Sequence, residues 1–161
     1  MSALQSLSFS GELLRRGFWL YVCEIETAKG DPWFYVVRTG DSSSAHPQSP
    51  FIRLSQHLGS NKNANALRRQ LLNVGIEPND RLKFEMVAYG PIHQERASMA
   101  DHAPLRNLVV AMGKALCDAL RTAGYKVLNS VNRRQKLDDQ SWQKVLAAFV
   151  ERFPKLKQTA K

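Results

Sequence analysis

Hydrophobic residues first gather in two short runs of strand character. Residues 18–26 (FWLYVCEIE) and 33–38 (WFYVVR) are rich in aromatic and β-branched side chains, which favour strands. Gly30 and Pro32 lie between the runs and supply turn chemistry. The two runs therefore predict an antiparallel hairpin. Residues 81–89 (RLKFEMVAY) alternate between apolar and polar positions and predict a third strand.

Apolar positions at helical spacing predict four helices. These are residues 50–58 with Pro50 in the first turn, a segment capped by Asn61 that buries Leu67 and Leu71, residues 105–122, and a segment after Ser141 that includes Trp142 and Phe149. The order of the elements predicts an α+β fold, in which a small three-stranded antiparallel sheet is flanked by helices and followed by an extra C-terminal helix.

The chain divides into three expected segments. Residues 1–16 form an N-terminal extension that begins with a Ser-rich stretch, and residues 17–131 form the main domain. Residues 132–161 supply the last helix and a frayed basic tail, packed on the same domain. A chain of 161 residues has little room for a second hydrophobic core.

The net charge of the chain indicates which class of partner to expect. The chain has 23 Lys and Arg against 14 Asp and Glu, a formal net charge of +9 and a pI near 9.9. Such an excess attracts polyanions, and nucleic acid is the usual partner of a basic domain. A basic surface kept for solubility is the alternative.

The sequence also indicates where in the cell the protein is expected. No apolar run approaches the roughly 20 residues that span a bilayer, so we expect no membrane partner. Residues 1–10 lack the order of a secretory signal, which makes a cytoplasmic location the expectation. Cys23 and Cys117 suggest neither a zinc site nor a disulfide framework.

Four residues from the predicted hairpin and the helix after it could gather around one anion. Tyr21 and Tyr35 lie on neighbouring strands, and Arg53 and His57 are four residues apart on a helix, so they share a face. Phosphodiester cleavage needs a base for the attacking water, positive charge for the transition state and usually a metal ion. These residue types therefore point to phosphate chemistry.

Four strings in this order resemble the GIY-YIG nuclease superfamily. They are WLY at 19–21, YVVRTGD at 35–41, PFIRLSQHL at 50–58 and VLNSV at 127–131. The resemblance covers roughly residues 17–131. It implies a small DNA endonuclease that hydrolyses phosphodiester bonds with a divalent metal, Mg²⁺ or Mn²⁺.

The resemblance also implies a role for each residue. Tyr21 would be the general base, although a free phenol has a pKa near 10 and needs a neighbouring proton acceptor or a lowered pKa. Tyr35 would orient water or phosphate, and Arg53 would hold the scissile phosphate with its planar fork of donors. His57 would assist proton transfer or contact phosphate. Asn129 would position the backbone or a metal-bound water.

Two positions depart from the family pattern. Val37 replaces the last Gly of the second string, and Gly113 occupies the position expected for the metal-binding Glu in LVVAMGKALCDAL. Asp118, one helical turn further on, is the first substitute considered, with Glu85 and Glu95 as others. Without a carboxylate a hard divalent cation lacks its preferred ligand. The resemblance therefore implies either an endonuclease or, as the alternative, a catalytically dead nucleic-acid-binding or protein-interaction module on that scaffold.

Positive side chains near the expected site predict a nucleic-acid surface. The residues assigned to it are Arg38, Lys62, Arg68, Arg69, Lys114, Arg133 and Arg134. Each phosphate they neutralise releases counterions, so binding should weaken steeply with salt. No element is shaped for reading base edges, which favours binding without sequence preference. DNA is the expected partner, with RNA an open alternative.

Overall fold

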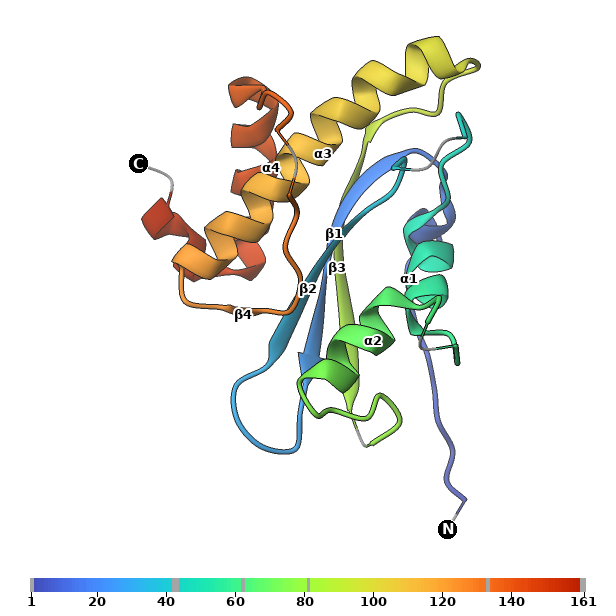
Figure 1. Cartoon of the computed structure of the whole chain (residues 1–161), viewed down its shortest axis with the longest axis vertical. Helices are drawn as coiled ribbons and strands as arrows, with labels where there is room; N and C mark the ends of the chain where they lie inside the picture. Colours follow the sequence, from blue (N-terminus) through green and yellow to red (C-terminus); the bar gives the residue numbers. More distant parts are fainter. Residues whose placement is uncertain (1, 42–43, 62, 81, 133, 160–161) are drawn as a thin grey trace.

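The computed structural model of the protein describes residues 2–41, 44–61, 63–80, 82–132 and 134–159. The helices and strands are, in chain order, η1 (Gly11–Leu14), β1 (Phe18–Glu26), β2 (Trp33–Arg38), α1 (Pro50–Leu58), α2 (Ala66–Asn73), β3 (Lys83–His93), α3 (Met99–Thr122), β4 (Lys126–Val127), α4 (Asp139–Arg152) and η2 (Pro154–Thr159), where η marks a 3₁₀ helix (Figure 1).

The sheet has the strand order β3-β1-β2-β4. β1 pairs antiparallel with both β2 and β3, which confirms the predicted hairpin and third strand. The expectation of three antiparallel strands is wrong in one respect, because β4 adds a fourth strand parallel to β2. β4 is two residues long and pairs with Trp33 and Phe34, so it has no periodicity of its own to detect. The α+β class holds, with a mixed sheet.

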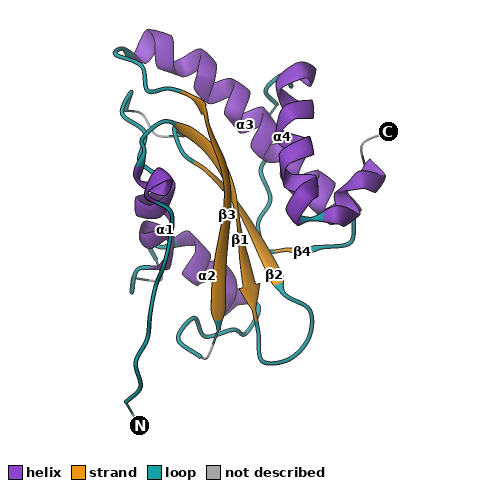
Figure 2. Cartoon of the chain, turned by 180° about the vertical axis from the view of Figure 1, so that it is seen from behind, coloured by secondary structure: helices purple, strands orange, loops and turns teal. Residues whose placement is uncertain are grey.

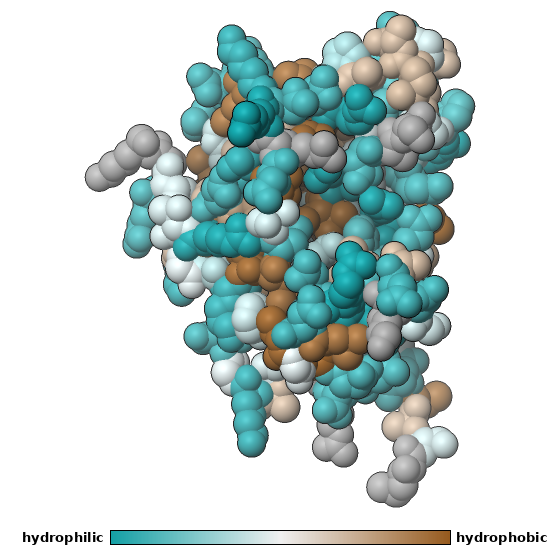
Figure 3. All heavy atoms as spheres, in the orientation of Figure 1, coloured by the Kyte–Doolittle hydropathy of each residue, from teal (hydrophilic) through white to brown (hydrophobic). Residues whose placement is uncertain are grey.

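Helices cover both faces of the sheet. Alternate side chains of a strand point to opposite faces, and here Leu20 and Val22 pack with α3 and α4 while Tyr21 and Cys23 pack with α2. The α3 and α4 side buries the larger cluster, which includes Phe149. Figure 2 shows the two helical layers on either side of the strands. In space-filling view, polar side chains dominate the face of Figure 1, with apolar ones visible between them (Figure 3).

The helix boundaries follow side-chain caps. Ser49 caps α1 by accepting a hydrogen bond from the N–H of Ile52, and α1 has the predicted bounds. α3 begins six residues before the predicted start because Ser98 caps it and the helix continues through Pro104. α2 begins only at Ala66. Asn61, the predicted cap, closes a turn instead, and its carbonyl accepts from Asn65.

β3 continues past its predicted end at residue 89 to His93. Gly90 and Pro91, which directly follow the predicted strand, lie within β3. β3 is an edge strand of the sheet, where the missing N–H of a proline is tolerated. Gly90 is needed there because its φ is +154° and a Cβ would lie 2.7 Å from the Trp19 ring. A tight approach between neighbouring strands therefore explains the glycine.

The predicted frayed tail is wrong for the described residues after α4. Pro154–Thr159 form the 3₁₀ helix η2, and Leu156 is completely buried in the larger core cluster. Arg152, at the end of α4, donates to the Glu24 carboxylate of β1 at 2.6 Å. The C-terminal segment is therefore part of the core. By contrast, residues 2–10 have no regular secondary structure and are exposed.

Gly113 lies buried in α3, facing β1 and β2. A Cβ there would meet Leu20 Cδ2 at 3.5 Å and Arg38 Cδ at 3.7 Å, which are ordinary van der Waals distances. A helix-interior glycine costs about 1 kcal/mol relative to alanine because it loses more backbone freedom on folding. No close packing at this position requires a glycine.

We therefore expect Gly113→Ala to raise the free energy of unfolding by about 0.5–1 kcal/mol. Urea unfolding, with an unchanged slope, measures this. Gly124→Ala is the matched control and should destabilise, because Gly124 has a φ of +91° that alanine adopts only with strain. A loss of stability in Gly113→Ala would show that α3 needs a glycine at this position.

Candidate functional site

A cleft of about 370 Å³ opens beside β2, where the chain after β4 runs along the strand. α1 supplies one wall, β2 the floor, and residues 129–132 the opposite wall. Its polar lining includes Tyr35, Arg38, Asp41, Arg53, His57 and Asn129. Tyr35, Arg53, His57 and Asn129 were all predicted to share a site, and they come from three separate segments of the chain.

Asn129 holds the second wall against β2. Its side-chain oxygen accepts from the N–H of Val36 at 3.0 Å, and its side-chain nitrogen donates to the Val36 carbonyl at 2.7 Å. The amide thus replaces a neighbouring strand at one residue of β2. Asn129 therefore has a positioning role, because both ends of its side-chain amide are bonded to the backbone of Val36.

Tyr35 and His57 contact each other in the lining of the cleft. The Tyr35 hydroxyl lies 3.4 Å from His57 Nδ1, a long hydrogen bond, and the two rings meet edge to face. Burial lowers the pKa of His57 to about 4, and the nearby Arg53 charge lowers it further. Burial raises the pKa of Tyr35 to about 12, against the opposing charge of Arg53. At neutral pH the pair is therefore a phenol beside a neutral imidazole, which can accept a proton.

Asp41 lies between two arginines. Its Oδ2 accepts from Arg53 Nη2 at 3.0 Å and lies 4.0 Å from Arg38 Nη2. Sequence reasoning did not select Asp41, because it falls in a polar loop. Its only signal was its place at the end of the RTGD string after β2. The two guanidinium groups and this carboxylate form a compact charged cluster in the cleft.

Tyr21 does not reach the cleft surface. Its side chain is completely buried with Tyr35 and Val37, and among the described residues its hydroxyl has no hydrogen-bond partner. Burial raises the pKa of Tyr21 well above its usual range, and the nearby Arg53 charge opposes this only in part. The phenol therefore stays protonated at neutral pH, so in this conformation Tyr21 is not poised to act as a base. It lies near enough to Arg53 to sense its charge.

Gly113 and Asp118 lie on α3, away from Tyr35. The Cβ position of Gly113 faces the aliphatic stem of Arg38, which lines the cleft, so a longer side chain there would extend toward the cleft wall. Asp118 is exposed and its carboxylate accepts from Lys114. Asp118 does not line the cleft.

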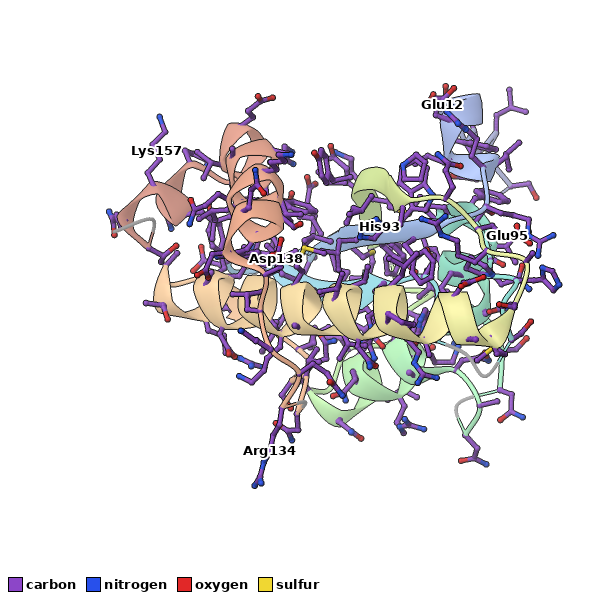
Figure 4. All side chains as sticks on the ribbon, turned by 90° about the horizontal axis from the view of Figure 1, so that it is seen from above. Glu12, His93, Glu95, Arg134, Asp138 and Lys157 are labelled. Atoms are coloured by element: carbon purple, nitrogen blue, oxygen red, sulfur yellow. The ribbon has the colours of Figure 1, made fainter. Side chains whose placement is uncertain are left out.

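The residues predicted to form a basic surface differ in the contacts that they make. Arg68 is used within the protein, because its guanidinium donates to the carbonyls of Leu58 and Gly59 at the end of α1. Arg69 is exposed on α2, with one nitrogen donating to the Asn63 carbonyl, and Lys114 is paired with Asp118. Arg134 projects away from α3 (Figure 4). Lys62 and Arg133 lie outside the described residues.

A divalent metal ion does not fit the cleft as it stands. Mg²⁺ and Mn²⁺ prefer several oxygen ligands, and the carboxylate in the cleft lining is Asp41, whose charge is already shared by Arg53 and Arg38. Across the part of the chain that the structure describes, no three His, Cys, Asp or Glu residues gather closely enough to hold a metal ion. The arrangement is instead suited to an anion.

Comparison with protein-family models, curated proteins and solved structures gave no match. Within the described residues no helix is long and apolar enough to cross a membrane.

The low pKa of His57 makes stability depend on pH. His57 has a folded pKa of about 4, below its ordinary value of 6.5, so between these values the unfolded chain binds a proton that the folded chain does not. The contribution of His57 to stability is complete above pH 6.5 and is lost as the pH falls toward 4.

We expect the urea midpoint of the protein to fall between pH 7.5 and pH 4.5, and the fall to be smaller in His57→Gln. Gln56→Ala, on the exposed side of the same helix, is the control for a general change in α1. An equal fall in the unchanged protein and in His57→Gln would contradict the assigned pKa.

Proposed function

We propose that this chain binds DNA by holding a backbone phosphate in the cleft, on a scaffold of GIY-YIG nuclease type. The observation that carries the proposal is the convergence of Tyr35, Arg53 and His57 with Asn129 on one cleft whose charged lining is rich in arginine. The formal net charge of +9 supports the same class of ligand.

Arg53 is the principal phosphate ligand in this proposal. Its guanidinium matches the geometry of a phosphate and is already oriented by the Asp41 carboxylate. A phosphate would take over those donors from Asp41, and Arg38 would contribute a second positive charge. The Tyr35 hydroxyl and the His57 ring lie beside the same space and can contact a phosphate oxygen.

Binding of this kind is insensitive to base sequence. Contacts to phosphate fix the position of a strand but carry no sequence information. Sequence-neutral or structure-selective recognition therefore follows, with a steep dependence on salt.

Hydrolysis of DNA is the second candidate function. It is supported by the unprotonated imidazole of His57 beside the Tyr35 phenol, which can accept a proton from water or from a hydroxyl but, with a pKa of about 4, is a weak base. Against efficient cleavage stands Gly113, which offers no carboxylate where the family resemblance implies one. We propose that this chain retains the phosphate-binding half of the site and cuts poorly.

Arg53→Gln should weaken binding of a 20-nucleotide DNA duplex about 10-fold or more, because a charge-assisted hydrogen bond is worth about 1.5–3 kcal/mol. Fluorescence anisotropy at fixed salt measures the affinity. Arg53→Lys should recover only part of it, since lysine lacks the fork. Lys157→Gln removes an equal charge at the far C-terminal end, where Lys157 points into solvent (Figure 4), and is the control. Equal affinities for Arg53→Gln and Lys157→Gln would refute the phosphate site.

Gly113→Glu should increase nicking of supercoiled plasmid in Mg²⁺ or Mn²⁺, because it adds a carboxylate beside Arg38 at the cleft wall. Gly113→Gln is the matched control of the same size without charge. Cutting by Gly113→Glu that does not exceed cutting by Gly113→Gln and by the unchanged chain would argue against an ancestral Glu at this position, while leaving DNA binding unaffected.

A further inference from the structure

A second, smaller pocket adjoins the cleft on the side of α3. It has a volume of about 220 Å³ and shares Arg38 and Asp41 with the cleft. Its remaining lining comes from Arg106, Asn107 and Val110 of α3, and from Gln135 in the segment before α4. Because two residues line both spaces, a single extended ligand can occupy them together.

The packing of α3 on β2 creates this pocket. Arg106, Val110 and Gly113 are spaced by four and three residues, so they share one face of the helix, and that face is turned toward Arg38. The Cβ position of Gly113 lies 3.7 Å from Arg38 Cδ, so the stem of Arg38 lies against this face of the helix. Arg38 therefore separates the cleft from the pocket and lines both.

The polar groups of the pocket have unused hydrogen-bonding capacity. Arg106, Asn107 and Gln135 make no side-chain hydrogen bond or ion pair with any described residue. A guanidinium carries five N–H donors and a carboxamide carries two. These donors face one small space, which is an arrangement suited to the several oxygens of a phosphate.

The charge balance of the two spaces together is positive. The described lining of the two spaces contains three guanidinium groups, of Arg38, Arg53 and Arg106, and one carboxylate, that of Asp41. Asp41 bonds to Arg53 and faces Arg38, so its negative charge is already shared. Of these three arginines, Arg106 makes no ion pair with a described carboxylate.

We propose that the pocket around Arg106 is a second phosphate subsite, which takes the phosphate next to the one held by Arg53 on the same DNA strand. This inference rests on the proposed function and specifies it further. Among the described residues that line the pocket there is no aromatic ring on which a base could stack, so the pocket suits the nucleic-acid backbone rather than a base. The Asp41 carboxylate also lines it and disfavours an isolated anion, so occupation by a strand already anchored at Arg53 is favoured.

The proposed subsite predicts the smallest ligand that should bind well. A strand that places phosphates in both spaces gains the donors of Arg106 and Asn107 in addition to those of Arg53. A mononucleotide with one phosphate fills only one space. The thymidine dinucleotide pTpT should therefore compete for the protein more effectively than thymidine 5′-monophosphate.

Arg106→Gln tests the subsite by fluorescence anisotropy with a labelled 20-nucleotide single strand and the matching duplex. We expect binding about 3–10-fold weaker, uniformly across sequences, and a slope of log affinity against log salt smaller by about one. Arg106→Lys should restore the slope because it restores the charge. In Arg106→Gln the advantage of pTpT over the monophosphate should disappear.

Lys157→Gln, which removes one positive charge from the C-terminal end, is the matched control (Figure 4). Arg106 is partly exposed, and glutamine is a good helix former, so the variant should fold. If Arg53→Gln weakens binding and Arg106→Gln behaves like Lys157→Gln, the subsite is refuted and the proposed function stands. If neither arginine matters, both are refuted.

Discussion

The carboxamide of Asn129 is the contact on which the candidate site depends. Its two ends bond to the N–H and carbonyl of Val36, while its own carbonyl accepts from Cys117 and Arg121 on α3. One residue thus links β2, the segment after β4 and the long helix. Buried backbone groups left without partners cost about as much as a lost hydrogen bond, so this arrangement fixes the position of that segment. Because the segment forms one wall of the cleft, the wall exists only while this bridge holds.

Asp41 has a comparable structural role for the two arginine side chains in the cleft, those of Arg38 and Arg53. Two guanidinium groups brought toward one cleft repel each other, and a carboxylate between them offsets that repulsion and orients Arg53. The same carboxylate competes with any incoming anion. The site therefore favours a polyanion that is held at several points over a small free anion, which agrees with the proposed ligand. A metal-dependent reaction would require further carboxylates than the described cleft lining provides.

Local patterns predicted the hairpin and α1 with their bounds, because these elements depend on strand-forming composition, a turn and a capped amphipathic segment that are contiguous in the chain. β4 was not predicted, because two residues carry no periodic pattern and their pairing with β2 is a long-range contact. The grouping of Tyr35, Arg53 and His57 was predictable from strand and helix geometry. The burial of Tyr21 was not, because a tyrosine in a strand gives the same sequence pattern whether its hydroxyl reaches solvent or is buried in the core. Asp41 was missed because a loop residue has no periodicity to show where it points.

The sheet separates a larger hydrophobic cluster under α3 and α4 from a smaller one under α2. Regions with less buried apolar surface open at lower free energy than the rest of a domain, and their amides exchange hydrogen sooner. Arg53 and His57 stand on α1, beside the smaller cluster, whereas Asn129 is tied to α3 and the larger one. The cleft therefore has one compliant side and one rigid side. The α1 wall can therefore adjust to the proposed nucleic-acid ligand, while the wall formed by Asn129 stays fixed on α3.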